Sequence, residues 1–259
     1  MPLFVDRLLE TGQLPDKVKV LVEAARGRHF AAYFRDEALQ GALAGMAVTG
    51  DLSSTEHDYF GVFTQNVVPS KTDYWQSRKL RSDVRLRPDG SARVTLEVEI
   101  HNDSAPYTGT EPDYHHGYLT RWATLSIGSF LPRAADVSGV TVDGAPIAFN
   151  VGEYFGRPFV RHTIEFEPQQ RHVLRLDYDV PAAAVLEDDG LTYRLDVDPQ
   201  GMVRPEAVST RVQFPEGFSI DALPDGWVAS GERAATWSVD ALDETPRLTL
   251  RAGGAGDTP

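Results

Sequence analysis

The sequence predicts a mainly β protein with a small N-terminal α+β part and two antiparallel, immunoglobulin-like β-sandwich units in tandem. Three observations support this fold class. Apolar residues recur at helical spacing near the N-terminus, but from Arg78 onward apolar and polar residues alternate, which is the period of a half-buried strand. Turn sequences at Pro88-Asp89-Gly90 and Asp143-Gly144 interrupt the alternation. The segment 181–190 has the composition of a linker and separates two β-rich stretches.

Residues 1–77 are the predicted N-terminal part. Segments 3–12 and 15–26 are expected to be short helices, with Gly12 and Gly27 at their ends. Segment 28–34 has an ambiguous period and is expected to be a short strand. Asp36 is a suitable N-cap for a third helix, which would bury Leu39, Ala42, Leu43 and Met46.

The stretch 60–75 connects this part to the β-rich region. We expect a strand, a polar turn at 66–71, and a second strand that opens with Tyr74 and Trp75. Because this strand lies between helical and β-rich segments, we expect Phe60, Val62 and Phe63 to belong to the core.

The first sandwich is assigned to 78–182 and the second, smaller one to 190–252. About eight strands in the first unit suit an immunoglobulin-like sandwich in size, although the Cys–Trp–Cys pattern of true immunoglobulin domains is absent. The second unit would be compact around Trp227 and Trp237. Residues 253–259 are expected to be a disordered tail.

The composition excludes several classes of function. A formal net charge of −13 argues against nucleic acid and anionic lipid as partners, since both need a clustered cationic surface. The absence of cysteine excludes disulfides, thiolate metal sites and cysteine nucleophiles. No run approaches the roughly 18 apolar residues of a membrane helix, and the start lacks the features of a signal peptide. We therefore expect a soluble acidic chain without membrane insertion.

Two motifs resemble a known family. The pattern RHFAAYFRDEALQGAL, followed by GVFTQNVVPSKTDYW and a charged alternating strand, resembles the C-terminal part of the DUF4012 family, from about residue 28 to 252. The resemblance implies an envelope-associated protein of unknown function from bacteria, mainly actinobacteria, with an extracytoplasmic location as part of a membrane-anchored protein. Family members usually carry a membrane-spanning helix and a further domain before this region, so the chain resembles a short relative or an excised C-terminal portion.

The turn after Phe63 gathers a possible small polar binding site: Asn66, Ser70, Lys71 and Asp73. An amide, a hydroxyl, a cation and a carboxylate close together can recognise a polar ligand. In the alternative interpretation the turn is structural: the Asn and Asp side chains hydrogen-bond their own backbone and Lys71 pairs with Asp73 in solvent.

The long polar loop 102–117 is the second candidate binding surface, with Tyr107, Tyr114, His115 and His116. Its two histidines are adjacent, and adjacent residues of an extended chain point in opposite directions, so they do not suit one ion. We therefore predict neither a metal site nor a cofactor. No catalytic motif is present, and no catalytic residue is assigned.

Two functions remain. The first is a non-enzymatic, extracytoplasmic interaction or structural module that contacts an envelope protein or glycan. The alternative is an enzyme, or a fragment of one, that acts on an envelope glycan or lipid-linked intermediate through the 66–73 loop. The first is preferred because sandwich domains without motif residues commonly serve adhesion or structure, which is an analogy at the level of the fold.

Overall fold

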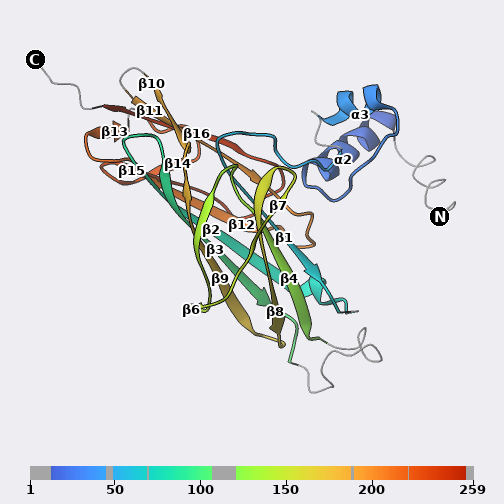
Figure 1. The fold of residues 1–259 in the computed structure, drawn as a ribbon. Helices are drawn as coiled ribbons and strands as arrows, with labels where there is room; N and C mark the ends of the chain where they lie inside the picture. The colour runs from blue at the N-terminus through green and yellow to red at the C-terminus, as the bar shows by residue number, and fades with distance from the viewer. Residues whose placement is uncertain are drawn as a thin grey trace, which may run out of the picture.

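The computed structural model describes residues 13–44, 49–68, 70–106, 121–187, 190–220 and 222–254. Two β-sheets, each with eight strands in the described residues, face each other, and a pair of short helices lies to one side (Figure 1). The prediction of a mainly β chain with a small helical N-terminal part is confirmed.

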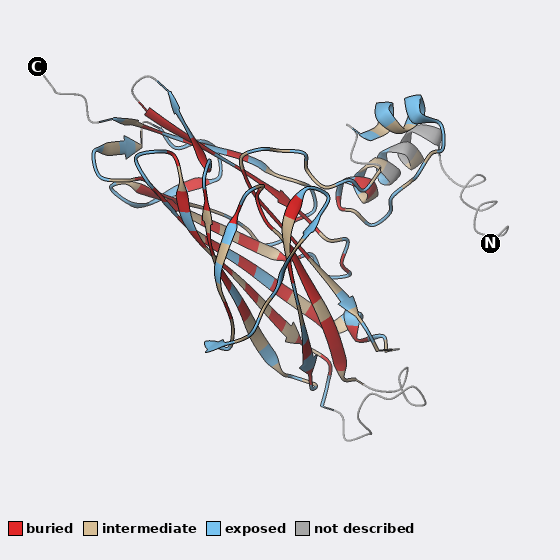
Figure 2. Cartoon of the chain, viewed as in Figure 1, coloured by how far each residue is buried: buried red, intermediate tan, exposed pale blue. Residues whose placement is uncertain are grey.

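The helices are α2 (Leu14–Arg26) and α3 (Glu37–Ala44). The N-cap prediction is confirmed, because Asp36 Oδ1 accepts a hydrogen bond from Leu39 N at 2.9 Å. The predicted buried face of α3 is wrong for Leu39, Ala42 and Leu43: no residue of α3 is buried, and exposed positions cover it in Figure 2. Met46 lies outside the described residues. Segment 28–34 forms no strand, and the predicted helix 3–12 lies outside the described residues.

Sheet A contains the first strand of the stretch 60–75, which we call the pivot, and strands from both predicted β units. Its order is β13 (Phe218–Ile220), β16 (Arg247–Gly254), β11 (Gly190–Asp198), β1 (Asp58–Asn66), β4 (Ala123–Phe130), β8 (Arg157–Phe166) and β7 (Val151–Tyr154), with β10 (Ala184–Glu187) paired to β11.

Sheet B has the same mixed origin. Its order is β14 (Trp227–Gly231), β15 (Ala234–Val239), β12 (Ala207–Gln213), β2 (Gln76–Leu86), β3 (Ala92–Asn102), β9 (Arg171–Val180), β5 (Asp136–Val142) and β6 (Ala145–Pro146). The predicted second strand of the pivot starts late, because Tyr74 and Trp75 belong to the 3-10 helix η1 (Thr72–Trp75) that precedes β2.

The prediction that all strands are antiparallel is wrong. β1 runs parallel to β11, with Asp58 opposite Leu195, and β2 runs parallel to β12, with Lys79 opposite Ala207. Both sheets are therefore mixed, and strands of the two predicted sandwich units are neighbours in the same sheets. The period-two pattern identifies the buried face of a strand but not its partner, which explains the error.

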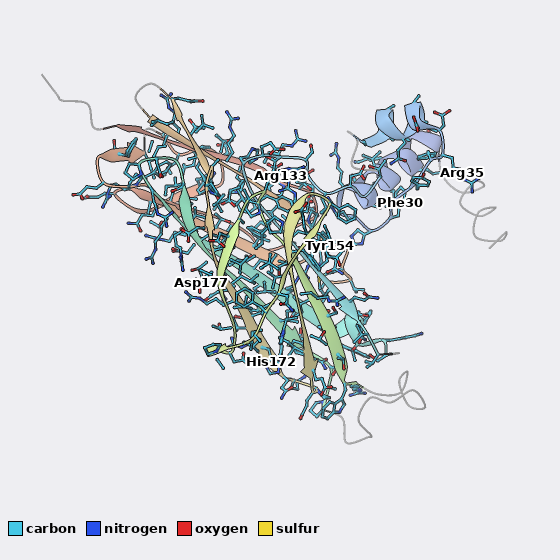
Figure 3. All side chains as sticks on the ribbon, viewed as in Figure 1. Phe30, Arg35, Arg133, Tyr154, His172 and Asp177 are labelled. Atoms are coloured by element: carbon cyan, nitrogen blue, oxygen red, sulfur yellow. The ribbon has the colours of Figure 1, made fainter. Side chains whose placement is uncertain are left out.

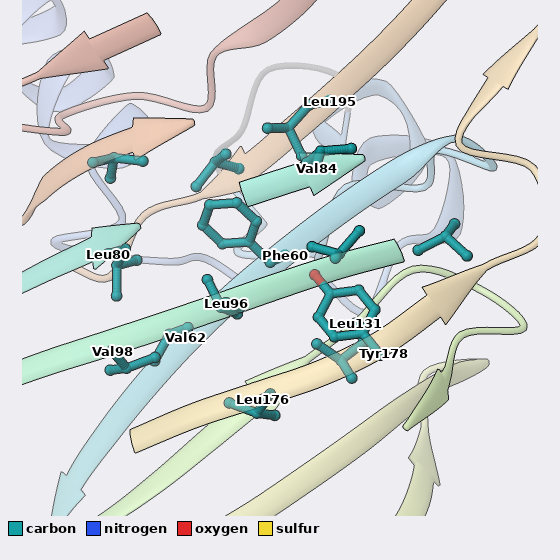
Figure 4. Packing of buried hydrophobic residues seen from close by; sticks show 14 of the residues in the cluster. Phe60, Val62, Leu80, Val84, Leu96, Val98, Leu131, Leu176, Tyr178 and Leu195 are labelled. Carbon is teal, nitrogen blue, oxygen red and sulfur yellow. The ribbon is translucent and has the colours of Figure 1, made fainter. Parts of the chain in front are cut away.

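The core lies between the sheets and is built by alternate residues of the central strands. Phe60 and Val62 of β1 are fully buried, as predicted, and pack with Leu96 of β3 and Leu176 of β9 in the same cluster (Figure 4). Phe63 is only partly buried, because it points to the outer side of β1.

One carboxyl group is buried at the start of β1. Asp58 is 1% exposed; its Oδ2 accepts a hydrogen bond from Tyr193 Oη at 2.7 Å, and its Oδ1 accepts one from Tyr59 N at 2.8 Å. Burial raises the pKa of Asp58 from 3.8 to about 6, and the two hydrogen bonds only partly oppose this change.

This pKa predicts a pH-dependent stability. A carboxyl whose pKa is raised in the folded state stabilises the fold fully below the unfolded value, and this contribution is lost as the pH rises through the folded value. Since one pKa unit corresponds to about 1.4 kcal/mol, the difference between 3.8 and about 6 corresponds to about 3 kcal/mol. Asp58→Asn should keep the geometry without the ionisation, because the amide oxygen still accepts from Tyr59 N.

Urea unfolding of wild type and Asp58→Asn at about pH 4 and about pH 7.5 measures this effect. The free energy of unfolding of the wild type should fall relative to that of the variant by about 2 kcal/mol between the two conditions, because at about pH 4 the carboxyl of the unfolded chain is already half ionised. An equal gap at both pH values would contradict the assignment.

Candidate functional site

Polar groups of the predicted loop 66–73 form hydrogen bonds with one another. Asn66 Nδ2 donates hydrogen bonds to Ser70 Oγ at 2.7 Å and to Thr72 Oγ1 at 3.0 Å, while Asn66 Oδ1 accepts one from Val68 N at 3.3 Å. These contacts satisfy the donors and acceptors of Asn66 within the turn. The structure thus brings Asn66 and Ser70 together, and the hydrogen bond from Val68 N is of the side-chain-to-backbone kind that the structural interpretation expects.

The charged residues of the loop are not paired with each other. Lys71 is exposed and makes no ion pair with any residue that the structure describes. Asp73 is also exposed by surface area, but partial desolvation of its carboxylate raises its pKa. The Lys71–Asp73 pair of the structural interpretation is thus absent from the described contacts.

A cleft of about 360 Å³ adjoins the loop and includes Asn66 and Asp73 in its lining, but neither Lys71 nor a histidine. Gln200 also lines the cleft. Its Oε1 accepts a hydrogen bond from Thr64 N at 2.7 Å, and its Nε2 donates one to Thr64 O at 2.8 Å. These bonds fasten the segment after β11 to β1. The other four predicted binding residues, Tyr107, Tyr114, His115 and His116, lie outside the described residues.

A histidine and a carboxylate meet on the outer side of sheet A. His57 Nε2 lies 3.0 Å from Asp196 Oδ1, and His57 Nδ1 lies 2.5 Å from Thr55 Oγ1. Burial raises the pKa of Asp196, but hydrogen bonds from His57 and Ser53 outweigh burial and leave that pKa below its ordinary value. These three groups follow the order of a nucleophile, a base and a carboxylate. However, His57 and Thr55 are two residues apart in one segment, and the bond from His57 to Asp196 fastens that segment to β11.

No group of three or more metal-ligating side chains that could hold an ion occurs within the described ranges. In the same ranges, no helix is both long enough and apolar enough to cross a membrane.

The outer side of sheet B carries a broad array of charges, which we call the arginine face. It consists of the outward side chains of four adjacent strands, β12, β2, β3 and β9. Seven of these residues are basic and five are acidic: Lys79, Arg81, Arg85, Arg93, Arg171, Arg175 and Arg211, with Asp83, Glu97, Glu99, Asp177 and Asp179. The array is therefore cationic in a chain whose formal net charge is −13.

Carboxylates on this face are shared between arginines. Asp83 contacts Arg85 at 3.1 Å and Arg211 at 3.3 Å, and Glu99 contacts Arg81 at 3.1 Å and Arg171 at 3.4 Å. Each carboxylate has about four acceptor positions, whereas two guanidinium groups bring ten N–H donors. Donors are therefore in excess on the face.

Asp179 repeats this arrangement at the end of β9. It accepts from Arg87 Nη2 at 2.5 Å and from Arg93 Nη1 at 2.8 Å, and the hydrogen bond from Arg87 holds the pKa of Asp179 below its ordinary value. Asp177 and His172, labelled in Figure 3, mark the course of β9 along this sheet.

The face is hollowed at its centre. A shallow depression of about 350 Å³ is lined by Arg81, Arg85, Arg175 and Arg211 together with Asp83 and Glu97. The sequence indicates the charged outer sides of β2 and β3, but it does not indicate that β12 and β9 flank them. Only the strand order brings Arg211 and Arg175 to the same depression.

Comparisons with known proteins show a likeness of fold alone. No family model and no curated protein sequence matches the chain. Among solved structures, a Legionella pneumophila protein described as nutrient-binding has a TM-score of 0.50 at 12% identity, with 76% of this chain and 70% of that chain covered.

Two enzymes are also similar over part of their length. Leukotriene A4 hydrolase from Saccharomyces cerevisiae has a TM-score of 0.38 at 8% identity, with 69% of this chain and 29% of that chain covered. An M1 zinc metallopeptidase from Deinococcus radiodurans has a TM-score of 0.33 at 11% identity, with 69% and 42% covered. This chain thus spans less than half the length of either enzyme.

Proposed function

We propose that the chain is a non-enzymatic interaction module of an envelope-associated protein and that the arginine face is its contact surface. The observation that carries this proposal is the sharing of Asp83, Glu99 and Asp179 between pairs of arginines, because it leaves guanidinium donors exposed without carboxylate acceptors. Arginine is enriched at interfaces and matches carboxylates and phosphates with two parallel hydrogen bonds.

The partner that fits these donors best is an acidic glycan. Its carboxylates would supply the missing acceptors along a sheet whose strands present arginines at alternate positions. The rest of this acidic chain repels such a polymer, but at physiological ionic strength charges beyond about 8 Å are largely screened. Contact across the face therefore outweighs repulsion from the opposite sheet. The location in the envelope rests on the family resemblance across residues 28–252.

Removing two central arginines should weaken binding to an acidic polymer. Immobilised polygalacturonate represents the acidic glycan, dextran is the neutral reference, and binding of the full chain is followed by biolayer interferometry. Arg81→Ala/Arg211→Ala should bind polygalacturonate at least roughly tenfold more weakly than wild type, equivalent to about 1.4 kcal/mol. Both side chains are exposed enough to be replaced without loss of core packing.

Arg161→Ala/Arg194→Ala is the matched control, since it removes the same charge from exposed positions of β8 and β11 on sheet A. Its affinity should stay within roughly twofold of wild type. Equal losses in the two double variants, or equal binding to dextran, would remove the arginine face from the proposal. Release of reducing ends from an envelope glycan preparation would instead support the enzymatic alternative.

A further inference from the structure

A pocket on the opposite sheet has a different chemistry. It has a volume of about 490 Å³ and lies between the segment 50–54 and the outer side of sheet A. Its lining includes three arginines and three phenylalanines: Arg28, Arg133, Arg157, Phe63, Phe130 and Phe155. This volume lies within the range of small-molecule sites, about 300–1,000 Å³.

Arg157, the first residue of β8, is the most unusual member of this lining. It is 1% exposed, its Nη2 donates to Ser53 O at 2.6 Å and Thr55 O at 2.8 Å, and its guanidinium carbon lies 4.0 Å from the centre of the Tyr59 ring. Its Nη1 has no hydrogen-bond acceptor among the described residues. That atom is closed to solvent, so Arg157 supplies positive charge behind the pocket wall rather than a donor that a ligand can reach.

The other two arginines differ in how far they are already satisfied. Arg28 is neutralised by Asp198, whose Oδ1 lies 2.9 Å from Arg28 Nη2. Arg133, labelled in Figure 3, donates from Nη1 to Gly156 O at 3.0 Å. Its Nε forms an ion pair with Glu56, whose Oε1 lies 3.0 Å away, and its side chain remains 38% exposed. Arg133 is thus the most exposed of the three guanidinium groups at this pocket.

Three aromatic side chains and the segment 50–54, which includes Asp51, form the rest of the lining. Phe130 packs edge-on against Phe63 with ring centres 5.8 Å apart, and Phe155 lies 6.1 Å from Phe130. Phe155 is 78% exposed and has φ of 55°, in the left-handed region that bulky residues rarely adopt. The hairpin between β7 and β8 therefore holds an exposed ring at the pocket in an unfavourable backbone conformation.

The segment that covers the pocket is held in place by buried carboxylates of β11. Ser53 N donates to Asp198 Oδ2 at 2.9 Å, and Ser53 Oγ donates to Asp196 Oδ2 at 2.6 Å. Tyr59 Oη also donates to Asp198 Oδ2, at 2.8 Å. These contacts fix the wall before any ligand arrives, which lowers the entropic cost of binding.

We propose that this pocket binds a small organic anion that joins a carboxylate to an aromatic ring. The carboxylate pairs with the exposed part of the Arg133 guanidinium, next to the positive charge of the buried Arg157, and the ring packs on Phe63, Phe130 and Phe155. The site lies on sheet A and is independent of the arginine face on sheet B, so either proposal can fail without the other.

The test uses three probes that separate the two halves of the ligand: 3-phenylpropionate, its neutral amide, and acetate. Binding to the full chain is measured by isothermal titration calorimetry and by ligand-detected NMR. The carboxylate probe should bind roughly ten- to a hundredfold more tightly than the amide, because the amide lacks the charge-assisted hydrogen bonds. Acetate should also bind more weakly, since it lacks the ring.

Variants then locate the site. Arg133→Gln should weaken binding of 3-phenylpropionate by at least roughly fivefold. Phe155→Asn should also weaken binding while keeping or improving stability, because Asn tolerates a positive φ and Phe does not. Neither variant changes the buried Arg157, so the test does not depend on a substitution that disturbs folding. Arg161→Ala, on the exposed side of β8, is the matched control and should bind as wild type does.

Three results would overturn the proposal. They are equal affinity for 3-phenylpropionate and its amide, unchanged affinity in Arg133→Gln and Phe155→Asn, and no detectable binding of any probe at millimolar concentration.

Discussion

Glu206→Gln is expected to lower the free energy of unfolding by about 3–5 kcal/mol, because it leaves the charge of Arg78 buried without a counter-ion. Arg78 and Glu206 have fully buried side chains, with Arg78 Nε 2.6 Å and Nη2 2.5 Å from Glu206 Oε2. Arg78 Nη1 also donates to Gln200 Oε1 at 3.0 Å, and Gln200 in turn holds Thr64. The pair thus joins β2 of one sheet to β1 of the other.

A double-mutant cycle separates the interaction energy of the ion pair from the cost of burying its two charges. Arg78→Met and Glu206→Met should each be as damaging as Glu206→Gln, whereas Arg78→Met/Glu206→Met should recover part of the loss, because two apolar side chains leave no buried charge. Urea unfolding of the four proteins gives the free energies. A loss below about 1 kcal/mol in both single variants would show that water reaches the pair.

Phe60→Ala is the second substitution with a large expected effect, about 3–5 kcal/mol of lost stability. Phe60 is fully buried in the centre of β1, between both sheets. Phe63→Ala should cost less, because Phe63 is only partly buried and faces the pocket on the outer side of the strand. Such a loss is a large part of a typical stability of about 5–15 kcal/mol.

Lys71→Ala is the control for these variants, because Lys71 is exposed. Its thermal melt should coincide with that of the wild type to within about 0.5 kcal/mol. If Lys71→Ala were as damaging as Phe60→Ala, the 66–73 loop would have to be a built site rather than a turn.

The sequence was informative about local structure and about which side of a strand is buried. Alternation at β2 and β3 predicted their inward residues correctly, and Asp36 predicted the start of α3. The amphipathic pattern of α3 was misleading, because apolar spacing says which residues share a face but not whether anything packs on it.

The candidate sites were harder to predict because they depend on long-range pairing. The loop residues Asn66 and Ser70 are close in sequence and were found together, as expected. Arg28, Arg133 and Arg157 are separated by long stretches of chain, and they meet at one pocket only because β1, β4 and β8 pair side by side in sheet A. The arginine face is similar, since β12 joins β2 only through a parallel pairing that no local pattern indicates.

The two parallel pairings also determine the order in which the protein can fold during synthesis. β1 and β2 are made early, yet each needs a neighbour from the C-terminal third of the chain, β11 for β1 and β12 for β2. Until those strands leave the ribosome, each of these strands has an unpaired edge, which is prone to pair with other chains. Such distant contacts also slow folding. The newborn chain is therefore expected to depend on protection by chaperones until β12 has emerged, and fragments that end before β11 should aggregate.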